Sequence, residues 1–315
     1  MERSASLTPT QQRLLGQLKR TPEPLIFDEG FIDGLIAKAR AGFADLSAQL
    51  GGERIWVSKY FVAQALACEA RHLAPSDFSW TPSTARGFVA HKAVELYSHW
   101  QGSPVLADVV DEALARLADE ASHRGDFVAG LSEADRAELR GASLERLTRF
   151  VQDYPPFDWR AEPITEAAGK WKASECIELT GRADLVMGRP EGRISTRLIV
   201  DFKTGNRSPQ HRDDLRFYAL VETLQRQVPP RKLATYYFDY AEADVEDVTP
   251  GLLESALKRA LGAVARHAEL ISGEREPLLR PSYSCRWCPL LSECNTGSSH
   301  LTMLDDDGSQ GFDDA

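Results

Sequence analysis

Four of the five cysteines in this chain of 315 residues are placed so that they can hold a metal centre together. Three of them form the pattern Cys285-x2-Cys288-x5-Cys294, and the fourth, Cys68, precedes them by 217 residues. In a reducing compartment, closely spaced cysteines bind metal more often than they form a disulfide scaffold. The pattern therefore predicts a fold in which a C-terminal segment returns to an N-terminal helix. The fifth cysteine, Cys176, is predicted to be a small core residue.

The composition indicates a globular protein, because 43% of the residues are hydrophobic and no biased repeat is present. No stretch approaches the roughly 20 apolar residues that a membrane helix needs. The N-terminus lacks the apolar segment of a secretory signal. We therefore expect a cytoplasmic location and no membrane partner.

The net charge of −10 argues against phosphate binding, which normally requires an excess of Lys and Arg. Five of these charges lie near the C-terminus, however, at Asp305, Asp306, Asp307, Asp313 and Asp314. Without residues 303–315 the net charge is −5, which still permits a basic groove. We expect residues 301–315 to form a disordered acidic tail.

Helical periodicity dominates the first half of the chain. Residues 1–52 are expected to form an N-terminal helical extension, and residues 53–300 one domain with a helical insertion at about 84–151. A helix is predicted from its N-cap Ser58 to about Ala70, with Cys68 in its last turn. Further helices are predicted at 84–100, 104–123, 132–151, 211–226 and 250–273.

Short strands are predicted after Pro163, at 164–178, 180–188, 195–203 and 233–239. The apolar run Leu198-Ile199-Val200 is typical of a central strand buried on both faces. Strands that alternate with helices in this way predict an α/β core with helical additions.

Two motifs, G-R-A-D at 181–184 and D-F-K-T-G at 201–205, place Asp184 and Asp201 at the ends of adjacent predicted strands. Two such carboxylates can share a hard divalent cation. The alternation of a strand puts Asp201 and Lys203 on the same face. A cation that polarises a phosphoryl oxygen, next to an ammonium group that stabilises developing charge, is the set that phosphodiester cleavage needs.

A histidine could complete this set. His91 lies in Gly87-x3-His91-x3-Glu95 on a predicted helix, where residues four apart share a face. It could add a nitrogen ligand to the two aspartates. Alternatively, His91 is a capped or half-buried histidine that binds no metal.

These motifs together resemble the RecB-like branch of the PD-(D/E)XK nuclease superfamily over roughly residues 55–298. The iron–sulfur members are most similar: the CRISPR-associated RecB-like exonucleases and the nuclease domain of AddB. The resemblance implies a restriction-endonuclease-like core, in which helices flank a central mixed sheet, with an iron–sulfur clamp. It also implies a Mg²⁺- or Mn²⁺-dependent deoxyribonuclease, expected to be a single-strand exonuclease in DNA repair, recombination or defence. The implied partners are DNA and a helicase or another DNA-processing subunit.

The resemblance also assigns roles to residues. It implies that His91, Asp184, Asp201 and the carbonyl group of Phe202 bind the divalent metal, and that Lys203 positions or activates the attacking water. Glu166 corresponds to an additional acidic position of the catalytic set, for which three other acids compete: Glu162, Glu175 and Glu178.

The chain departs from the family on the predicted helix at 211–226. The family often has Q-x3-Y there, whereas this chain has Asp214-x3-Tyr218. Phosphate contacts from Arg212 and Arg216 could compensate, although both could also be solvated surface residues. Stacking on unpaired bases is open to four aromatic residues, each of which could equally be part of the core: Trp171, Phe217, Tyr218 and Trp287.

The cysteine pattern is similar to that of the iron–sulfur nucleases and implies a 4Fe-4S cluster held by Cys68, Cys285, Cys288 and Cys294. Thiolates suit zinc as well, so a site made of His300 and the three C-terminal cysteines is the rival. Two other functions remain open. One is a non-catalytic iron–sulfur DNA-binding or adaptor subunit, and the other is a zinc-stabilised interaction protein.

Overall fold

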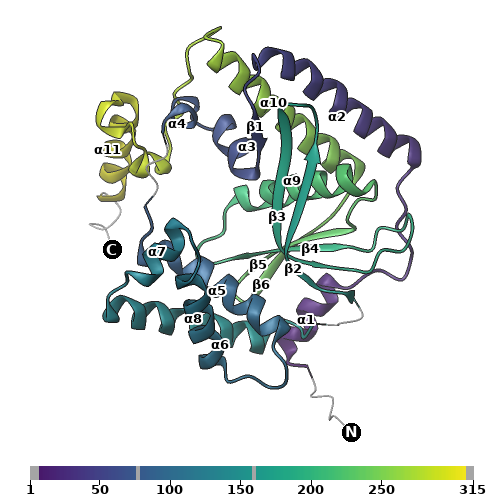
Figure 1. The fold of residues 1–315 in the computed structure, drawn as a ribbon, viewed down its shortest axis with the longest axis vertical. Helices are drawn as coiled ribbons and strands as arrows, with labels where there is room; N and C mark the ends of the chain where they lie inside the picture. The colour runs from purple at the N-terminus through teal and green to yellow at the C-terminus, as the bar shows by residue number, and fades with distance from the viewer. Residues whose placement is uncertain (1–6, 76–78, 158–160, 310–315) are drawn as a thin grey trace. The chain divides into compact units, whose positions relative to one another are not determined.

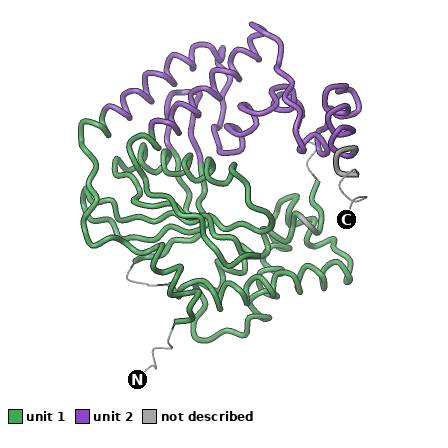
Figure 2. The backbone as a smooth tube through the Cα atoms, turned by 180° about the vertical axis from the view of Figure 1, so that it is seen from behind, with its two compact units in different colours: residues 1–33, 79–170, 181–253 green, residues 34–78, 171–180, 254–315 purple. Residues whose placement is uncertain are grey.

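The structure, a computed structural model, describes residues 7–75, 79–157 and 161–309. The chain forms two compact units (Figure 2). The first unit comprises residues 1–33, 79–170 and 181–253, and the second comprises residues 34–78, 171–180 and 254–315. No helix among those described combines the length and the apolar character needed to cross a membrane.

Within the described residues, six strands form one mixed sheet in the order β1-β3-β4-β5-β6, and β2 pairs with β3 beside this path (Figure 1). The strands are β1 (Ile55–Val57), β2 (Ile164–Lys172), β3 (Ile177–Met187), β4 (Leu198–Lys203), β5 (Lys232–Tyr237) and β6 (Glu242–Asp247). β4 and β5 are parallel, whereas β3 with β4 and β5 with β6 are antiparallel. The predicted α/β fold with a central mixed sheet is confirmed.

Strand β4 is the centre of the first unit because five of its six residues, Leu198–Phe202, are buried. Both of its faces are covered, which agrees with its continuous apolar sequence. Leu198, Val200 and Phe202 face one hydrophobic core, which they share with a layer of helices. These helices are α1 (Pro9–Leu18), α5 (Pro82–His99), α6 (Leu106–Ala118), α7 (His123–Ala129) and α8 (Glu133–Asp153). Helix α9 (Pro209–Arg226) packs against β4 and β5.

The helices begin where short polar side chains cap them. Thr8, Thr81 and Ser132 each accept a hydrogen bond from the backbone N–H three residues ahead, at the start of α1, α5 and α8. Such caps satisfy backbone donors that have no partner inside the helix and contribute about 1 kcal/mol each.

The second unit is mainly helical. It contains most of α2 (Glu29–Gln49) and α10 (Pro250–Ile271), together with α3 (Lys59–Leu66), α4 (Glu69–Leu73), the 3₁₀ turns η2 (Tyr283–Trp287) and η3 (Leu291–Glu293), and α11 (Asn295–Ser309). Helices α2 and α10 approach closely at Gly42, where an added Cβ would lie 2.8 Å from Leu261 Cδ2. The second unit also holds β1 and its parallel partners in β3, Ile177–Leu179.

Several predicted boundaries differ from the structure. The helix from Ser58 breaks at Ala67, so Cys68 is the N-cap of α4 and not part of a last turn. The strand predicted at 164–178 ends at Lys172, because residues 174–176 form a bend before β3. Helix α11 extends to Ser309, so most of the segment expected to be disordered is helical. The rest of that segment, residues 310–315, lies outside the described residues.

Candidate functional site

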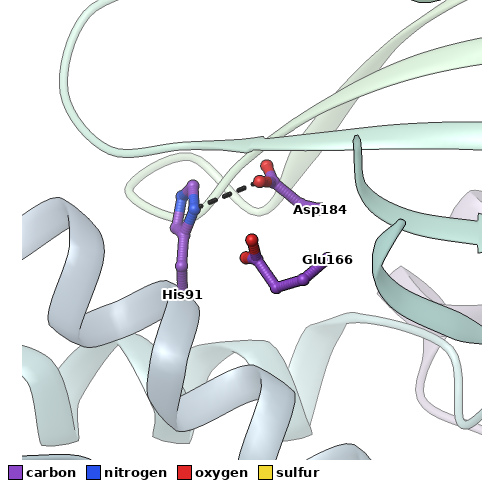
Figure 3. A group of neighbouring side chains, drawn as sticks. All are labelled: His91, Glu166 and Asp184. Carbon is purple, nitrogen blue, oxygen red and sulfur yellow. Dashed lines mark ion pairs between the residues drawn. The ribbon is translucent and has the colours of Figure 1, made fainter. Parts of the chain in front are cut away.

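Three side chains from three different elements of the first unit converge on one point. His91 of α5, Glu166 of β2 and Asp184 of β3 each offer a ligand atom, and these atoms all lie within 4.8 Å of one another (Figure 3). His91 Nδ1 lies 3.4 Å from Asp184 Oδ1. One imidazole nitrogen and two carboxylates form a donor set suited to a divalent cation.

The helix that carries His91 lies close to the end of β4. A Cβ added to Gly87, one turn before His91, would lie 3.3 Å from Thr204 Oγ1. Glycine at position 87 therefore allows α5 to approach the D-F-K-T-G motif. This approach brings His91 toward Asp184.

Glu166 reaches the site through an unusual backbone conformation. Its φ angle is +50°, in the left-handed region that non-glycine residues rarely adopt. Such a conformation costs on the order of 1–3 kcal/mol and is concentrated at functional positions. Its side chain points toward His91 and Asp184 in Figure 3.

Asp184 is joined to the D-F-K motif by a backbone contact. The N–H of Phe202 donates a hydrogen bond of 2.6 Å to Asp184 Oδ2. The antiparallel pairing of Leu185 with Val200 brings Asp184 next to this end of β4. Asp201 and Lys203 lie on one face of β4, as strand alternation predicts, and their side chains form an ion pair.

Burial and neighbouring charges shift the pKa values of His91, Glu166 and Asp184. Burial opposes the protonation of His91, but the carboxylates of Asp184 and Asp201 outweigh it and raise the pKa of the imidazole. Burial likewise opposes ionisation of Asp184, yet His91, Lys203 and the Phe202 N–H lower its pKa. The pKa of Glu166 is raised, first by burial and second by the charge of Asp184. The site therefore concentrates negative charge that a cation would neutralise.

The family of the chain follows from a comparison with family models. The model of the PD-(D/E)XK nuclease superfamily matches residues 58–295, which is well over half of the chain. The chain belongs to this superfamily. The match spans all the residues of the converging group, so a nuclease superfamily and a candidate divalent-metal site coincide.

The solved structures that match the chain are distant from it. The protein SSO0001 is 13% identical, with 76% of this chain and 96% of that chain covered and a TM-score of 0.30. A protein from Eubacterium rectale described as a candidate exonuclease is 12% identical, with 65% and 89% covered and a TM-score of 0.33. No curated protein matches the chain.

The structure separates the four glutamates that compete for one position in this nuclease fold. Glu162 forms an ion pair with Arg189 at 2.9 Å, and Glu175 forms one with Lys172 at 2.9 Å. Glu178 lies in the part of β3 that belongs to the second unit. Of the four, Glu166 is the one in the group with His91 and Asp184.

The sequence did not single out Asp239, which follows β5. Asp239 Oδ2 accepts a hydrogen bond of 2.6 Å from the N–H of Gly205, and Asp239 also forms an ion pair with Arg146 at 3.1 Å. It thereby fixes the turn directly after Lys203. The available signal was the predicted order of strand 195–203, helix 211–226 and strand 233–239, because a helix between two strands favours parallel pairing, and residues after two parallel strands meet at one edge of a sheet.

The residues expected to contact DNA are placed differently from one another. Arg212 is exposed, but Arg216 forms ion pairs with Glu246 and Asp213. Among the four aromatic residues considered for base stacking, Trp171, Phe217 and Tyr218 are each at most 7% exposed, and Trp287 is 62% exposed. The three buried rings pack in the interior, so the structure does not place them for stacking.

Asp214, where the resemblance led us to expect a glutamine, lies beside an amide group. Asp214 Oδ1 accepts a hydrogen bond of 2.9 Å from Nε2 of Gln210, one turn earlier on α9. The helix therefore carries an amide and a carboxylate side by side.

Four cysteines of the second unit line one pocket of about 250 Å³: Cys68, Cys285, Cys288 and Cys294. Two of their sulfurs accept backbone hydrogen bonds, Cys285 Sγ from the N–H of Ser282 at 3.4 Å and Cys294 Sγ from the N–H of Gly297 at 3.3 Å. His300 is not among the described residues that line this pocket.

The element that carries Cys68 is held to the C-terminal segment by Glu69. This fully buried carboxylate accepts hydrogen bonds from Arg275 at 2.6 and 3.0 Å and from the N–H of Leu278 at 2.8 Å. The hydrogen bonds with Arg275, helped by that of Leu278, lower the pKa of Glu69 to about 2. Cys176 lies apart from the pocket, in the bend before β3, with its Sγ 2.6 Å from Ser47 Oγ.

Proposed function

We propose that this member of the PD-(D/E)XK superfamily is a Mg²⁺- or Mn²⁺-dependent deoxyribonuclease of the RecB-like branch. It removes nucleotides from single-stranded DNA ends in repair, recombination or defence. One observation carries the proposal: His91, Glu166 and Asp184 converge within 4.8 Å, beside the neighbouring strand that holds Asp201 and Lys203.

The donors around this point suit a hard divalent cation. We assign as ligands His91, Asp184, Asp201 and the carbonyl group of Phe202, with Glu166 as a further acid of the site. Burial, followed by the charge of Asp184, raises the pKa of Glu166, so a bound cation would favour the ionised form of this acid. A bound divalent cation would polarise a phosphoryl oxygen and lower the pKa of a water molecule.

Lys203 has a different role in the proposal. Its side chain is 19% exposed and lies on the same face as the buried Asp201. There it can orient the attacking water and stabilise the charge that develops on the phosphate. The side chain of Asp239, through the N–H of Gly205, holds the backbone that follows Lys203.

We further propose that the four cysteines of the pocket hold a 4Fe-4S cluster. Their number, their common pocket and the two backbone N–H groups directed at sulfur support this assignment. The cluster would have a structural role, since it would link α4 to the segment around η2 and η3. Zinc bound by the same thiolates is the alternative that metal analysis would detect.

The function is tested with 5′- and 3′-end-labelled single- and double-stranded DNA, in the presence of Mg²⁺ or Mn²⁺ and in EDTA. We expect nucleotides to be released from single strands with either cation and not in EDTA. Asp184→Asn removes one anionic ligand and should abolish release, whereas the matched surface variant Asp111→Asn should retain it. DNA binding without release by the wild-type protein would instead favour the adaptor function.

A further inference from the structure

The second unit exposes a pair of aromatic rings beside the cysteine pocket. Tyr283 and Trp287 are 60% and 62% exposed, and both belong to η2, which also contains Cys285. Their ring centroids lie 5.3 Å apart, with the ring planes at 73° to each other. Large apolar side chains exposed as a group commonly mark a contact surface.

A cation accompanies the two rings. The guanidinium carbon of Arg286 lies 5.1 Å from the centroid of the Tyr283 ring, in cation–π geometry. Arg280 is also exposed. Arg286 also forms an ion pair with Asp305. The flat faces of the two exposed rings, and not a local excess of positive charge, are therefore the feature suited to a ligand.

The backbone under these side chains is fixed by several hydrogen bonds. The N–H of Cys285 donates to the carbonyl of Ser282 at 2.9 Å, and the N–H of Cys288 donates to the carbonyl of Cys285 at 3.0 Å. Arg71 donates to the carbonyl of Ser284 at 3.1 Å. Rings presented from a fixed turn lose little conformational freedom when a ligand stacks on them.

We propose that Tyr283, Arg286 and Trp287 form a platform on which bases of single-stranded DNA stack. Flat aromatic faces accept any unpaired base, and arginine adds contacts to bases or phosphates, which gives binding without sequence preference. A duplex hides its base faces, so the platform would favour single strands. The proposal rests on the proposed function only for the choice of DNA as ligand, and binding is measurable without hydrolysis.

The test compares two 20-nucleotide probes in EDTA, so that no cleavage occurs. One probe is oligo(dT), and the other is an abasic strand with the same phosphates and no bases. Fluorescence anisotropy is recorded for the full-length wild-type protein and for Tyr283→Ala, Trp287→Ala and Trp287→Phe. Trp56→Ala is the matched control, because Trp56 is 59% exposed in β1 of the same unit. Metal content and circular dichroism confirm that each variant is intact.

Loss of one stacked base should weaken oligo(dT) binding roughly 5- to 150-fold. We expect this loss for Tyr283→Ala and Trp287→Ala, a smaller one for Trp287→Phe and none for Trp56→Ala. Binding of the abasic probe should be the same for all five proteins.

Equal losses of affinity on both probes, or no loss on oligo(dT), would overturn the platform. A change of oligomeric state in Trp287→Ala with unchanged oligo(dT) binding would also overturn it, in favour of contact with a second copy. A protein that shows the expected pattern but never cleaves DNA with Mg²⁺ or Mn²⁺ would retain the platform and lose the proposed hydrolytic function.

Discussion

The ring of Tyr218 occupies the space that any side chain on Gly181 would need. A Cβ at position 181 would lie 2.7 Å from Tyr218 Cδ1 and 2.8 Å from Cε1. Gly181 begins the G-R-A-D segment that carries Asp184, and Tyr218 lies on α9. The G-R-A-D segment and helix α9 are therefore joined by direct packing between Gly181 and Tyr218. This packing explains why position 181 is a glycine.

Gly181→Ala should destabilise the first unit, because Tyr218 would have to leave its position in the core. Overpacking of this kind typically costs about 1–3 kcal/mol. Chemical denaturation would measure the loss in the free energy of unfolding. The control is Gly141→Ala in α8, where an added Cβ meets no atom within 4 Å and should be neutral or slightly stabilising. If Gly181→Ala is as stable as Gly141→Ala, the packing relationship is wrong.

Glu166→Gln should separate metal binding from stability. Because burial and Asp184 raise the pKa of Glu166, its ionised form at neutral pH costs folding free energy, which glutamine would relieve. Without metal, the melting temperature should be equal to that of the wild type or higher. The increase in melting temperature on addition of Mn²⁺ should shrink. Glu162→Gln, which affects a surface ion pair, should preserve that increase. A full Mn²⁺ response in Glu166→Gln would remove Glu166 from the site.

The lowered pKa of His72 predicts that the stability of the second unit depends on pH. Its Nε2 lies 3.0 Å from His267 Nδ1, and burial followed by the charge of His267 lowers its pKa to about 4. Between pH 6.5 and 4 the unfolded chain binds more protons than the folded one, so stability falls as the pH falls through this window. From pH 7 to pH 5 the loss should be at most about 2 kcal/mol.

Thermal unfolding at pH 7 and pH 5 measures this effect. His72→Gln should lose less stability between the two pH values than the wild type. His123→Gln, which changes an exposed histidine of α7, should match the wild type. Equal pH dependence in all three proteins would show that His72 does not titrate as described.

Substitutions of Cys68 and Cys176 should have different effects on the iron content of the protein. Cys68→Ser should lose iron, because a cluster would keep only three thiolates. Cys176→Ser should keep its iron, because Cys176 lies outside the pocket and its partner Ser47 can bond to a hydroxyl group. Iron and sulfide analysis after anaerobic purification measures the cluster content of both variants and of the wild type. Full iron content in Cys68→Ser, or zinc alone in the wild type, contradicts the cluster.

Much of the fold could be predicted because its central elements have unambiguous patterns. Leu198-Ile199-Val200 is apolar throughout, as a strand covered on both faces requires. Strand β6 was missed because it is an edge strand with the polar sequence E-A-D-V-E-D, which lacks an apolar signal. The break at Ala67 was also missed, since alanine is a strong helix former and nothing local marks a helix end there.

The site was predictable where strand alternation determines it and not where tertiary packing does. Asp201 and Lys203 are two residues apart in β4, so the alternation of a strand is enough to place them on the same face. Both Glu162 and Glu166 have a left-handed φ angle, and the choice of Glu166 depends on its approach to His91 and Asp184, which no local pattern reveals. The burial of Tyr218 depends on the approach of α9 to Gly181, a contact between segments distant in sequence.

The rate at which Lys203→Ala releases nucleotides from end-labelled single-stranded DNA in Mn²⁺ tests the proposed hydrolysis most directly. Asp201 and His91 remain in this variant, so it should bind metal and DNA nearly as the wild type does. Loss of a positioned ammonium group should slow release on the order of 10²- to 10⁴-fold. The comparison uses preparations of equal metal content and equal circular dichroism, because a collapsed fold would resemble a defective site. Release at the wild-type rate would contradict the role of Lys203 and, with it, the proposed active site.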